Sequence, residues 1–297
     1  KSMRLFVRQF EDYCFVVQGA VDLRSYKGSY VTLEVLESIR RIYPGAQLIL
    51  STWSNQVLDE VVKGLVDELV LSEDPGPIKS SDGILNINRQ ILNSLAGVNA
   101  ASRKFCIKVR SDTVVENTNL VHAFEKKSVG KVLVTNLTSV NPRKRKRFLA
   151  VCDWVYVGET KVIQSIFDIP FYPQELTKHR ISNSSPFLNA EQWITINFLN
   201  KMIDIDLVEQ ALKDEITIEN HESLVAEFFR IISFHKLGLK STKYSLFYFG
   251  LSAMYTQKES DLRLEKCNRG LRMDVEFAVY YLAAIPLLRK LVKFFRW

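Results

Sequence analysis

The feature that most constrains the fold is an alternation of short apolar segments and amphipathic segments over the first two-fifths of the chain. Apolar runs of strand length lie at residues 13–18, 47–51, 68–71 and 105–110. The segments between them, at residues 31–42, 57–65 and 86–100, have apolar residues at helical spacing. Strands that alternate with helices of this length predict βαβ units, and therefore a parallel sheet with right-handed crossovers.

The rest of the chain is less regular. Helices are predicted at 118–126, 161–167, 190–202, 206–212 and 223–235, strands at 131–135 and 154–157, and loops at 72–83 and 170–188. No internal repeat or low-complexity linker interrupts the sequence. We therefore predict one α/β domain over residues 1–297, with a mixed, mostly parallel sheet flanked by helices and a helical C-terminal elaboration.

Charge and cysteine content narrow the function. The 297 residues include 40 Lys or Arg against 33 Asp or Glu, a net charge of +7, which favours an anionic partner. The four cysteines share no CxxC spacing, so we expect buried, reduced thiols and no zinc site. The N-terminus has no signal-peptide pattern, and no apolar run reaches the roughly 18 residues of a membrane span. These features predict a cytoplasmic protein.

Familiar catalytic motifs are missing. The sequence contains no GxxxxGK[ST], GxGxxG, HExxH or GxSxG, which excludes the common P-loop, dinucleotide, metalloprotease and hydrolase sites. The four histidines are scattered and are more typical of structural positions, although one of them could complete a metal site with Asp112.

Polar residues, one glycine and one tryptophan stand where the predicted N-terminal strands end. They are Gln18, Gly19, Ser51, Thr52, Trp53, Asp74 and Asp112. Each alone is typical of a turn or cap. Because the carboxyl ends of parallel strands share the sheet edge at which open α/β folds bind ligands, however, the set favours a ligand site. Arg89, near the start of the next predicted helix, is either an exposed side chain or a diphosphate ligand at a helix N-terminus.

Two sets of segments resemble known enzymes. Asn88-Arg89-Gln90, a helix with small residues and an apolar strand ending in an acid resemble the core of GT-A glycosyltransferases. More specifically, the chain resembles the WavE lipopolysaccharide-synthesis family in several short segments over about residues 13–200. These segments are 17–21, 43–46, 50–53, 108–112, 153–154, 158–159 and 190–192.

The resemblance implies a GT-A-like enzyme that transfers a sugar from a nucleotide-sugar donor to lipopolysaccharide or another bacterial surface glycan. It implies a nucleotide-binding part over about 13–115 and an acceptor part over about 116–260. GT-A strands end in a DXD-type motif that binds Mn²⁺ or Mg²⁺, but here Arg110 stands where the first Asp is expected. Either Asp112 holds the cation with fewer carboxylates, or Arg110 itself meets the phosphate.

Glycosyl transfer needs a stabilised leaving group and, for inversion, a carboxylate base. Glu191 is the first candidate base, because a helix starting near residue 190 would present it to the sugar. Asp153 is the second candidate. The alternative for Glu191 is an acid that the helix dipole favours in a first turn.

Two basic segments suggest further partners. Residues 143–147 are five consecutive cations without aromatic residues, which is more typical of a solvated loop near anionic lipid than of a nucleic-acid site. Residues 275–297 predict a basic amphipathic helix. Its apolar face either docks on an anionic membrane surface, which we favour, or packs against the domain itself. Its candidate membrane contacts are Arg289, Lys290, Lys293, Phe294, Phe295, Arg296 and Trp297.

The sequence therefore predicts a glycosyltransferase at the inner face of the cytoplasmic membrane, acting on a lipid-linked glycan acceptor and needing no nucleic acid. One alternative is a non-catalytic nucleotide- or nucleic-acid-binding protein that uses residues 143–147. A second alternative is a sugar nucleotidyltransferase, although the Gly-rich N-terminal signature of that group is missing.

Overall fold

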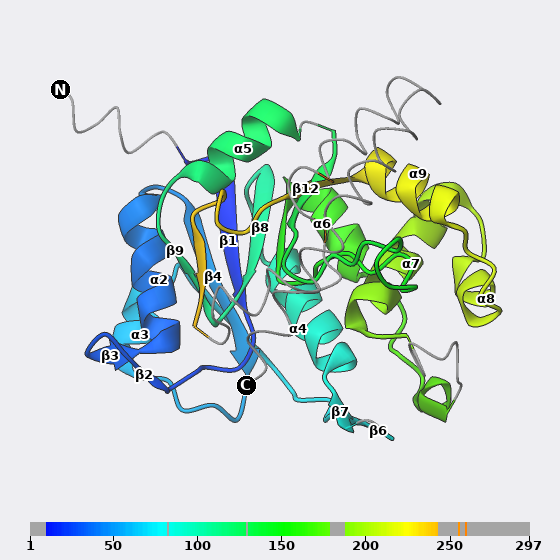
Figure 1. Ribbon diagram of the computed structural model, residues 1–297. Coiled ribbons are helices and arrows are strands. Elements are labelled where there is room, and N and C mark those ends of the chain that lie inside the picture. The colour runs from blue at the N-terminus through cyan, green and yellow to red at the C-terminus, as the bar shows by residue number, and fades with distance from the viewer. Residues whose placement is uncertain are drawn as a thin grey trace, which may run out of the picture.

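A seven-stranded sheet forms the centre of the computed structural model, in the strand order β12-β10-β11-β8-β1-β4-β5 (Figure 1). The structure describes residues 10–81, 83–128, 130–178 and 188–242, together with Tyr255 and Glu259. The strands of this sheet are β1 (Tyr13–Gln18), β4 (Gln47–Trp53), β5 (Glu68–Ser72), β8 (Phe105–Arg110), β10 (Val132–Thr135), β11 (Val155–Glu159) and β12 (Phe229–Ile232).

One reversed strand makes the sheet mixed. β1 is parallel to β4 and β8, β4 is parallel to β5, and β10 is parallel to β12, whereas β11 is antiparallel to both β8 and β10. The start of β11 therefore lies at the same edge as the carboxyl end of β8. The predicted class, a mixed and mostly parallel α/β sheet, is confirmed.

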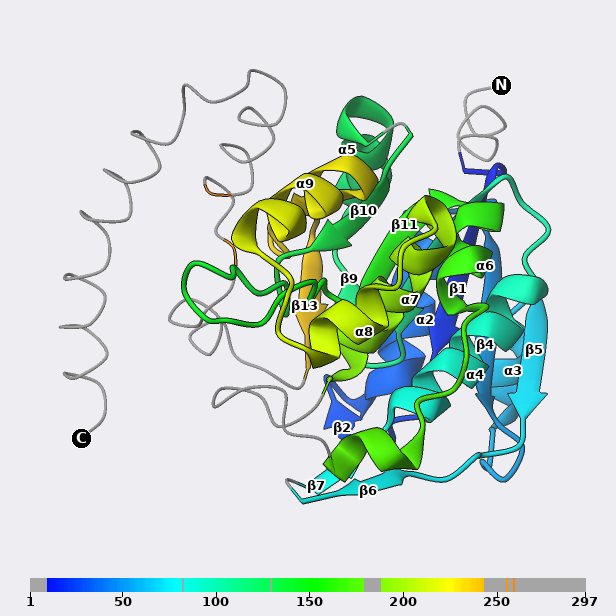
Figure 2. The ribbon, with the colours of Figure 1, turned by 90° about the vertical axis from the view of Figure 1, so that its right-hand side faces the viewer.

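Helices cover both faces of the sheet (Figures 1 and 2). One face carries α2, α3 and α5, and the other carries α4, α6 and α7. The helices are α2 (Val31–Ile42), α3 (Glu60–Leu65), α4 (Ile87–Asn99), α5 (Asn119–Lys127), α6 (Thr160–Phe167), α7 (Ala190–Ile203), α8 (Leu207–Leu212) and α9 (Ile218–Phe228), with a short 3₁₀ turn, η1 (Gln174–Lys178).

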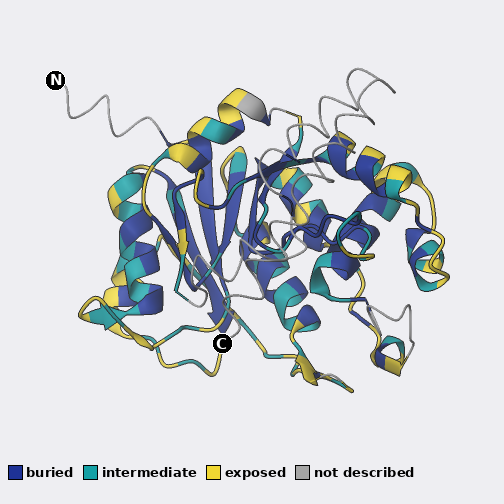
Figure 3. Cartoon of the chain, viewed as in Figure 1, coloured by how far each residue is buried: buried dark blue, intermediate teal, exposed yellow. Residues whose placement is uncertain are grey.

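The central strand shows why its sequence is apolar without interruption. Along β1, Cys14 and Val16 belong to the core beneath α4 and α6, while Phe15 and Val17 belong to the core beneath α2. Successive side chains of a strand point to opposite faces, so a strand covered on both sides buries all of them. Figure 3 shows this central layer as buried throughout.

The prediction of a helix over 223–235 is wrong in its second half. A capping box between Thr217 and Asn220 starts α9, which ends at Phe228, and the next residues form β12 instead. β12 pairs in parallel with β10, and three of its four residues are buried. Pairing with a distant strand thus overrides the local helical pattern.

Short elements were also missed. The predicted loop at 72–83 contains β6 (Ile78–Ser80), which forms a hairpin with β7 (Gly83–Leu85). β2 (Ser25–Tyr26) pairs with β3 (Ser29–Tyr30), and β9 (Thr113–Val115) pairs with β13 (Leu239–Ser241). Such short strands carry too few residues for a period-2 pattern to stand out.

Three further expectations concern cysteines and the membrane. Cys14, Cys106 and Cys152 are free and buried, as predicted. Within the described ranges, no helix has the length and apolar character required to cross a bilayer. The predicted membrane helix at 275–297, with its candidate contacts, lies outside the described residues.

Candidate functional site

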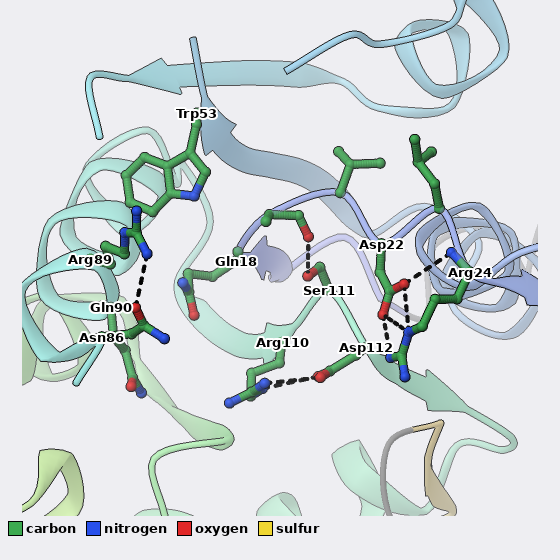
Figure 4. Close-up of a pocket in the computed structure, with 14 residues that line it drawn as sticks. Gln18, Asp22, Arg24, Trp53, Asn86, Arg89, Gln90, Arg110, Ser111 and Asp112 are labelled. Atoms are coloured by element: carbon green, nitrogen blue, oxygen red, sulfur yellow. Dashed lines mark hydrogen bonds and ion pairs between the residues drawn. The ribbon is translucent and has the colours of Figure 1, made fainter. Parts of the chain in front are cut away.

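A pocket of about 700 Å³ lies at the carboxyl edge of the parallel strands (Figure 4). Its walls come from residues 18–24 at and beyond the end of β1, Trp53 at the end of β4, three residues at the start of α4 and residues 110–112 at and beyond the end of β8. The α4 residues are Asn86, Arg89 and Gln90. This is the edge at which open α/β folds bind ligands.

The loop after β1 is fixed against its neighbours by hydrogen bonds of its backbone to both main-chain and side-chain atoms. The Gly19 amide donates to Ser51 O (3.1 Å) and to Asn93 Oδ1 (3.1 Å). Gly19 has a φ of +129°, and a Cβ at this position would lie 2.9 Å from Ser111 Oγ. Ser111 Oγ in turn donates to Ala20 O at 2.7 Å. Glycine is therefore required where the loops after β1 and β8 meet.

The structure brings most of the predicted ligand residues to this pocket. Those that line it are Gln18, Gly19, Trp53, Arg89, Arg110 and Asp112. Ser51 and Thr52 do not, which corrects the expectation that they face a ligand. Both are fully buried, since β4 continues to Trp53: Ser51 Oγ donates to Asn93 O (2.7 Å), and Thr52 Oγ1 donates to Gln56 Oε1 (3.1 Å).

Each acid at the pocket is paired with an arginine. Asp22 is bound by Arg24 through two guanidinium nitrogens, one contact of the pair being very short. Asp74, which lies just outside the lining, is bound by Arg89 at 2.7 and 2.5 Å. This contact with Arg89 lowers the pKa of Asp74 below its usual value.

The third pair joins Arg110 to Asp112 at the end of β8. Arg110 Nε and Nη2 contact the two carboxylate oxygens of Asp112, both at 2.9 Å. The guanidinium carbon also lies 4.2 Å from the centroid of the Trp154 ring, so the group is stacked on an aromatic face. The guanidinium of Arg110 is thus held by hydrogen bonds at its edge and by stacking on its flat face.

The residues at this edge do not fit a divalent cation. Both oxygens of Asp112 already face Arg110, and the other pocket acid, Asp22, faces Arg24. Over the part of the chain that the structure describes, His, Cys, Asp and Glu nowhere form a group of three suited to a metal. Hard cations need several oxygen ligands.

A buried lysine lies behind the pocket. Lys108, in the middle of β8, has no exposed surface and donates to the backbone oxygen of Asp153 at 2.7 Å. Gln90, from the pocket wall, donates to the same oxygen at 3.1 Å. Burial lowers the pKa of Lys108 to about 8, although the negative charge of Asp153 opposes that shift. Two donors thus hold the backbone before β11.

The two candidate catalytic acids, Glu191 and Asp153, are close enough for their charges to interact. Asn189 caps α7 and places Glu191 in its first turn. Burial, reinforced by the charge of Asp153, raises the pKa of Glu191 to about 8. Asp153 is 4% exposed, and its Oδ1 has no hydrogen-bond partner among the described residues. Neither acid lines the pocket, although Asp153 is joined to its wall through the hydrogen bond from Gln90.

The basic run at 143–147 is partly neutralised. Arg143 binds Glu222 at 2.6 and 2.9 Å, and Lys144 binds Glu259 at 2.9 Å. These pairs tie the segment to α9 and to the chain near residue 259, so it is not the uniformly solvated loop that the sequence predicts.

Several site residues were missed in the sequence. They are Asp22, Arg24, Asn86, Gln90, Lys108, Ser111 and Trp154. Lys108 carried a readable signal, because a lysine in an apolar strand marks a buried charge. The others lie in loops or at a helix start, where no pattern distinguishes a pocket residue from a turn residue.

Comparison with known proteins gives one family and several distant structures. The family model described as WavE lipopolysaccharide synthesis matches residues 13–293. No curated protein matches the chain significantly. Among solved structures, a cytidylyltransferase from Leptospira borgpetersenii is 10% identical, with a TM-score of 0.40 and coverage of 93% of this chain and 96% of that chain.

Two further structures are similarly distant. A CMP:2-keto-3-deoxy-manno-octonic acid synthetase in complex with CTP is 12% identical, with a TM-score of 0.41 and coverage of 65% of this chain and 87% of that one. TarS from S. aureus, residues 1–349 with UDP, is 15% identical, with a TM-score of 0.40 and coverage of 73% and 70%. Likenesses of this size establish no shared activity.

Proposed function

Because this chain belongs to the WavE lipopolysaccharide synthesis family, we propose that it is a glycosyltransferase. It moves a sugar from a nucleotide donor to a growing lipopolysaccharide or other bacterial surface glycan. The observation that carries this proposal is the arrangement at the sheet edge, where Gln90 of an arginine-lined pocket donates to the backbone of Asp153, whose buried carboxylate acts electrostatically on the partly buried Glu191. Such a site offers anion binding and proton transfer side by side.

The pocket supplies the donor site. Trp53 presents an aromatic ring for the base, while Arg89 and Arg110 supply cationic donors for the two phosphates. Gly19 lets the backbone approach the ligand closely. Positive charge at the diphosphate stabilises the leaving nucleoside diphosphate as the glycosidic bond of the donor breaks.

Glu191 is the proposed base for the acceptor, with Asp153 as the second candidate. The acceptor hydroxyl gives its proton to Glu191 while its oxygen bonds to the anomeric carbon, and the bond from that carbon to the diphosphate breaks. Lys108 and Gln90 position Asp153 through its backbone oxygen. Because the pKa of Glu191 is raised to about 8, the ionised base becomes more abundant as the pH approaches that value.

We further propose a lipid-linked acceptor and a location at the inner face of the cytoplasmic membrane. The family's role in lipopolysaccharide synthesis and the basic amphipathic sequence at 275–297 support this. Deleting residues 287–297 should weaken binding to vesicles of anionic lipid without lowering the melting temperature. Unchanged vesicle binding would contradict the membrane proposal.

A donor screen tests the central proposal. UDP-, GDP-, CMP- and dTDP-sugars, each with Mn²⁺, Mg²⁺ or EDTA, are added to the full chain and the melting temperature is measured. A ligand that binds only the native state must raise it, so we expect one nucleotide class to do so. The same donor should then release its nucleotide in the presence of a glycan acceptor.

Two results would contradict the proposal. One is that no donor stabilises the protein under any condition. The other is that a nucleoside triphosphate and a sugar phosphate yield pyrophosphate, which would show nucleotidyl transfer. Strong salt-dependent binding of DNA or RNA without donor binding would favour the nucleic-acid alternative, against which the ion pairs of Arg143 and Lys144 argue.

A further inference from the structure

We infer that the diphosphate of the donor is bound by Arg110 in place of a divalent cation, so that donor binding is independent of metal. The inference rests on the proposed function and deepens it, because it names what neutralises the leaving group. It starts from the bidentate pair at the end of β8, in which Arg110 meets both oxygens of Asp112.

The pair follows from the spacing of the two residues. Arg110 is the last residue of β8 and Asp112 lies in the turn that follows, which brings its carboxylate back against the guanidinium. Two acids at these positions would converge on a cation, whereas an arginine at the first position converges on the acid at the second. An arginine in place of the first acid therefore removes one ligand for a cation, and its guanidinium also occupies the carboxylate of the second acid. The two 2.9 Å contacts of Arg110 with Asp112 have this arrangement.

Within the pair, the arginine is the more accessible partner. The Arg110 side chain is 29% exposed and the Asp112 side chain is 9% exposed, so the carboxylate lies beneath the guanidinium. The two contacts with Asp112 use Nε and Nη2 of a guanidinium that has five N–H donors in all. An anion entering the pocket thus meets Arg110 before it meets Asp112.

The rest of the pocket is built in the same way. Figure 4 shows Arg89 and the Asp22–Arg24 pair on opposite sides of the hollow, with Arg110 between them. Asp74 orients Arg89 as Asp112 orients Arg110. Arginine binds phosphate in a bidentate, directional manner. The chemistry that suits this pocket is therefore an anion with two adjacent phosphates, as in a nucleoside diphosphate.

The test compares binding with and without metal. Binding of UDP, GDP, CDP and dTDP to the full chain is measured by calorimetry in EDTA and again in Mn²⁺. We expect the Kd of the preferred nucleotide to agree within about twofold between the two conditions. Arg110→Lys should raise that Kd by about tenfold or more in both, because a lysine keeps the charge but loses the fork that grips phosphate and Asp112.

Arg103→Lys is the matched control, since Arg103 is exposed just before the opposite end of the same strand. Its Kd should equal that of the unaltered protein, and the melting temperatures of both variants confirm folding. Binding that requires Mn²⁺, or unaltered binding by Arg110→Lys, would overturn the inference while leaving a nucleotide-binding enzyme in place. Absence of binding by all four nucleotides in both conditions would overturn the inference, and the proposed function falls with it only if no nucleotide sugar of the donor screen stabilises the protein.

Discussion

The acids at the edge of the pocket and the acids behind it are in opposite electrostatic situations. Asp74 lies at the pocket, where contact with Arg89 lowers its pKa. Glu191 lies outside the pocket lining, where burial and the charge of Asp153 raise its pKa to about 8. An acid of the first kind is favoured in its ionised form and orients a cation, whereas the raised pKa of the second kind suits the proposed role of a base. The difference thus separates the proposed donor binding from the proposed proton transfer.

The backbone keeps the acids paired with arginine at the pocket close to Asp153 and Glu191 but separate from them. Trp154 stacks on Arg110 at the pocket, while its chain neighbour Asp153 is buried and its charge acts on Glu191. Gln90 lines the pocket and at the same time donates to the backbone oxygen of Asp153. The following changes test whether the two sets of acids act separately.

The largest effect is expected for Glu191→Gln. This variant keeps the shape of the side chain but removes the proposed base, so turnover should fall by about 10²–10⁴-fold. Donor affinity should stay within about twofold, because Glu191 does not line the pocket. Initial rates at saturating donor, together with calorimetry, measure both quantities. Glu175→Gln, at an exposed position of η1, is the control.

Near-normal turnover of Glu191→Gln would remove this residue from the mechanism. Asp153→Asn would then be the next variant to assay. A joint loss of turnover and donor affinity would instead show that the two sets of acids are not separate.

Gly97→Ala should disturb both sets by moving α4. An added Cβ would lie 2.5 Å from Val16 Cγ1 and 2.8 Å from Ser51 Cβ, so the helix must shift away from the sheet. Overpacking of this kind costs about 1–3 kcal/mol of unfolding free energy. Chemical denaturation measures the loss, and donor affinity should weaken as well, because α4 carries Arg89 and Gln90.

Gly64→Ala is the paired control in α3, where an added Cβ meets nothing within 4 Å. Alanine is the better helix former, so this variant should gain up to about 1 kcal/mol. Equal stability of the two variants would show that the packing of α4 on β1 and β4 accommodates an added methyl group.

The stability of Glu191→Gln should also differ from that of the unaltered protein in a pH-dependent way. The folded protein holds a proton on Glu191 that the unfolded chain releases near pH 4.5, so the contribution of Glu191 to stability falls as the pH rises toward about 8. Removing the titrating group should therefore raise the unfolding free energy at pH 8 by about 1–2 kcal/mol. This is less than the full pKa shift would give, because the Glu191 side chain is partly accessible to solvent. Chemical denaturation across this pH range measures the unfolding free energy of both proteins. A difference between them that does not grow with pH would contradict the prediction.

Asp74→Asn should show the smallest effect, with the opposite sign. The lowered pKa of Asp74 means that its contribution is present above its usual pKa of 3.8 and is lost as the pH falls through the lowered value. The partly exposed pair with Arg89 is worth up to about 1 kcal/mol at neutral pH. The same denaturation series checks it. A larger loss at acidic pH than at neutral pH would refute this assignment.

The sequence predicts some elements to the residue and misses others. The bounds of β1, α2 and β8 are those predicted, because buried apolar runs and one amphipathic stripe define them locally. β12 was missed because it forms only by pairing with β10, which lies about a hundred residues earlier in the chain. Single-sequence periodicity contains no information about such pairing.

The site divides in the same way. Arg110 and Asp112 were found because a strand ends there, whereas Asp22 and Arg24 lie in a loop with no regular pattern. Ser51 was misplaced because β4 is longer than its apolar run: Trp53 still pairs with Ser72, so Ser51 remains inside the sheet. Strand length, which neighbouring strands determine, decided which polar residues reach the pocket.

The pairing of β13 with β9 has a consequence for synthesis of the chain. Leu239 pairs with Val115, and the Thr242 amide and hydroxyl both donate to the Asp112 backbone oxygen at 3.3 Å. A nascent chain that has emerged only as far as β8 contains the strands of the pocket but lacks this support. Long-range contacts of this kind form late and slow folding. Ribosome-bound intermediates should therefore acquire a protease-resistant pocket edge only after residue 242 has left the exit tunnel.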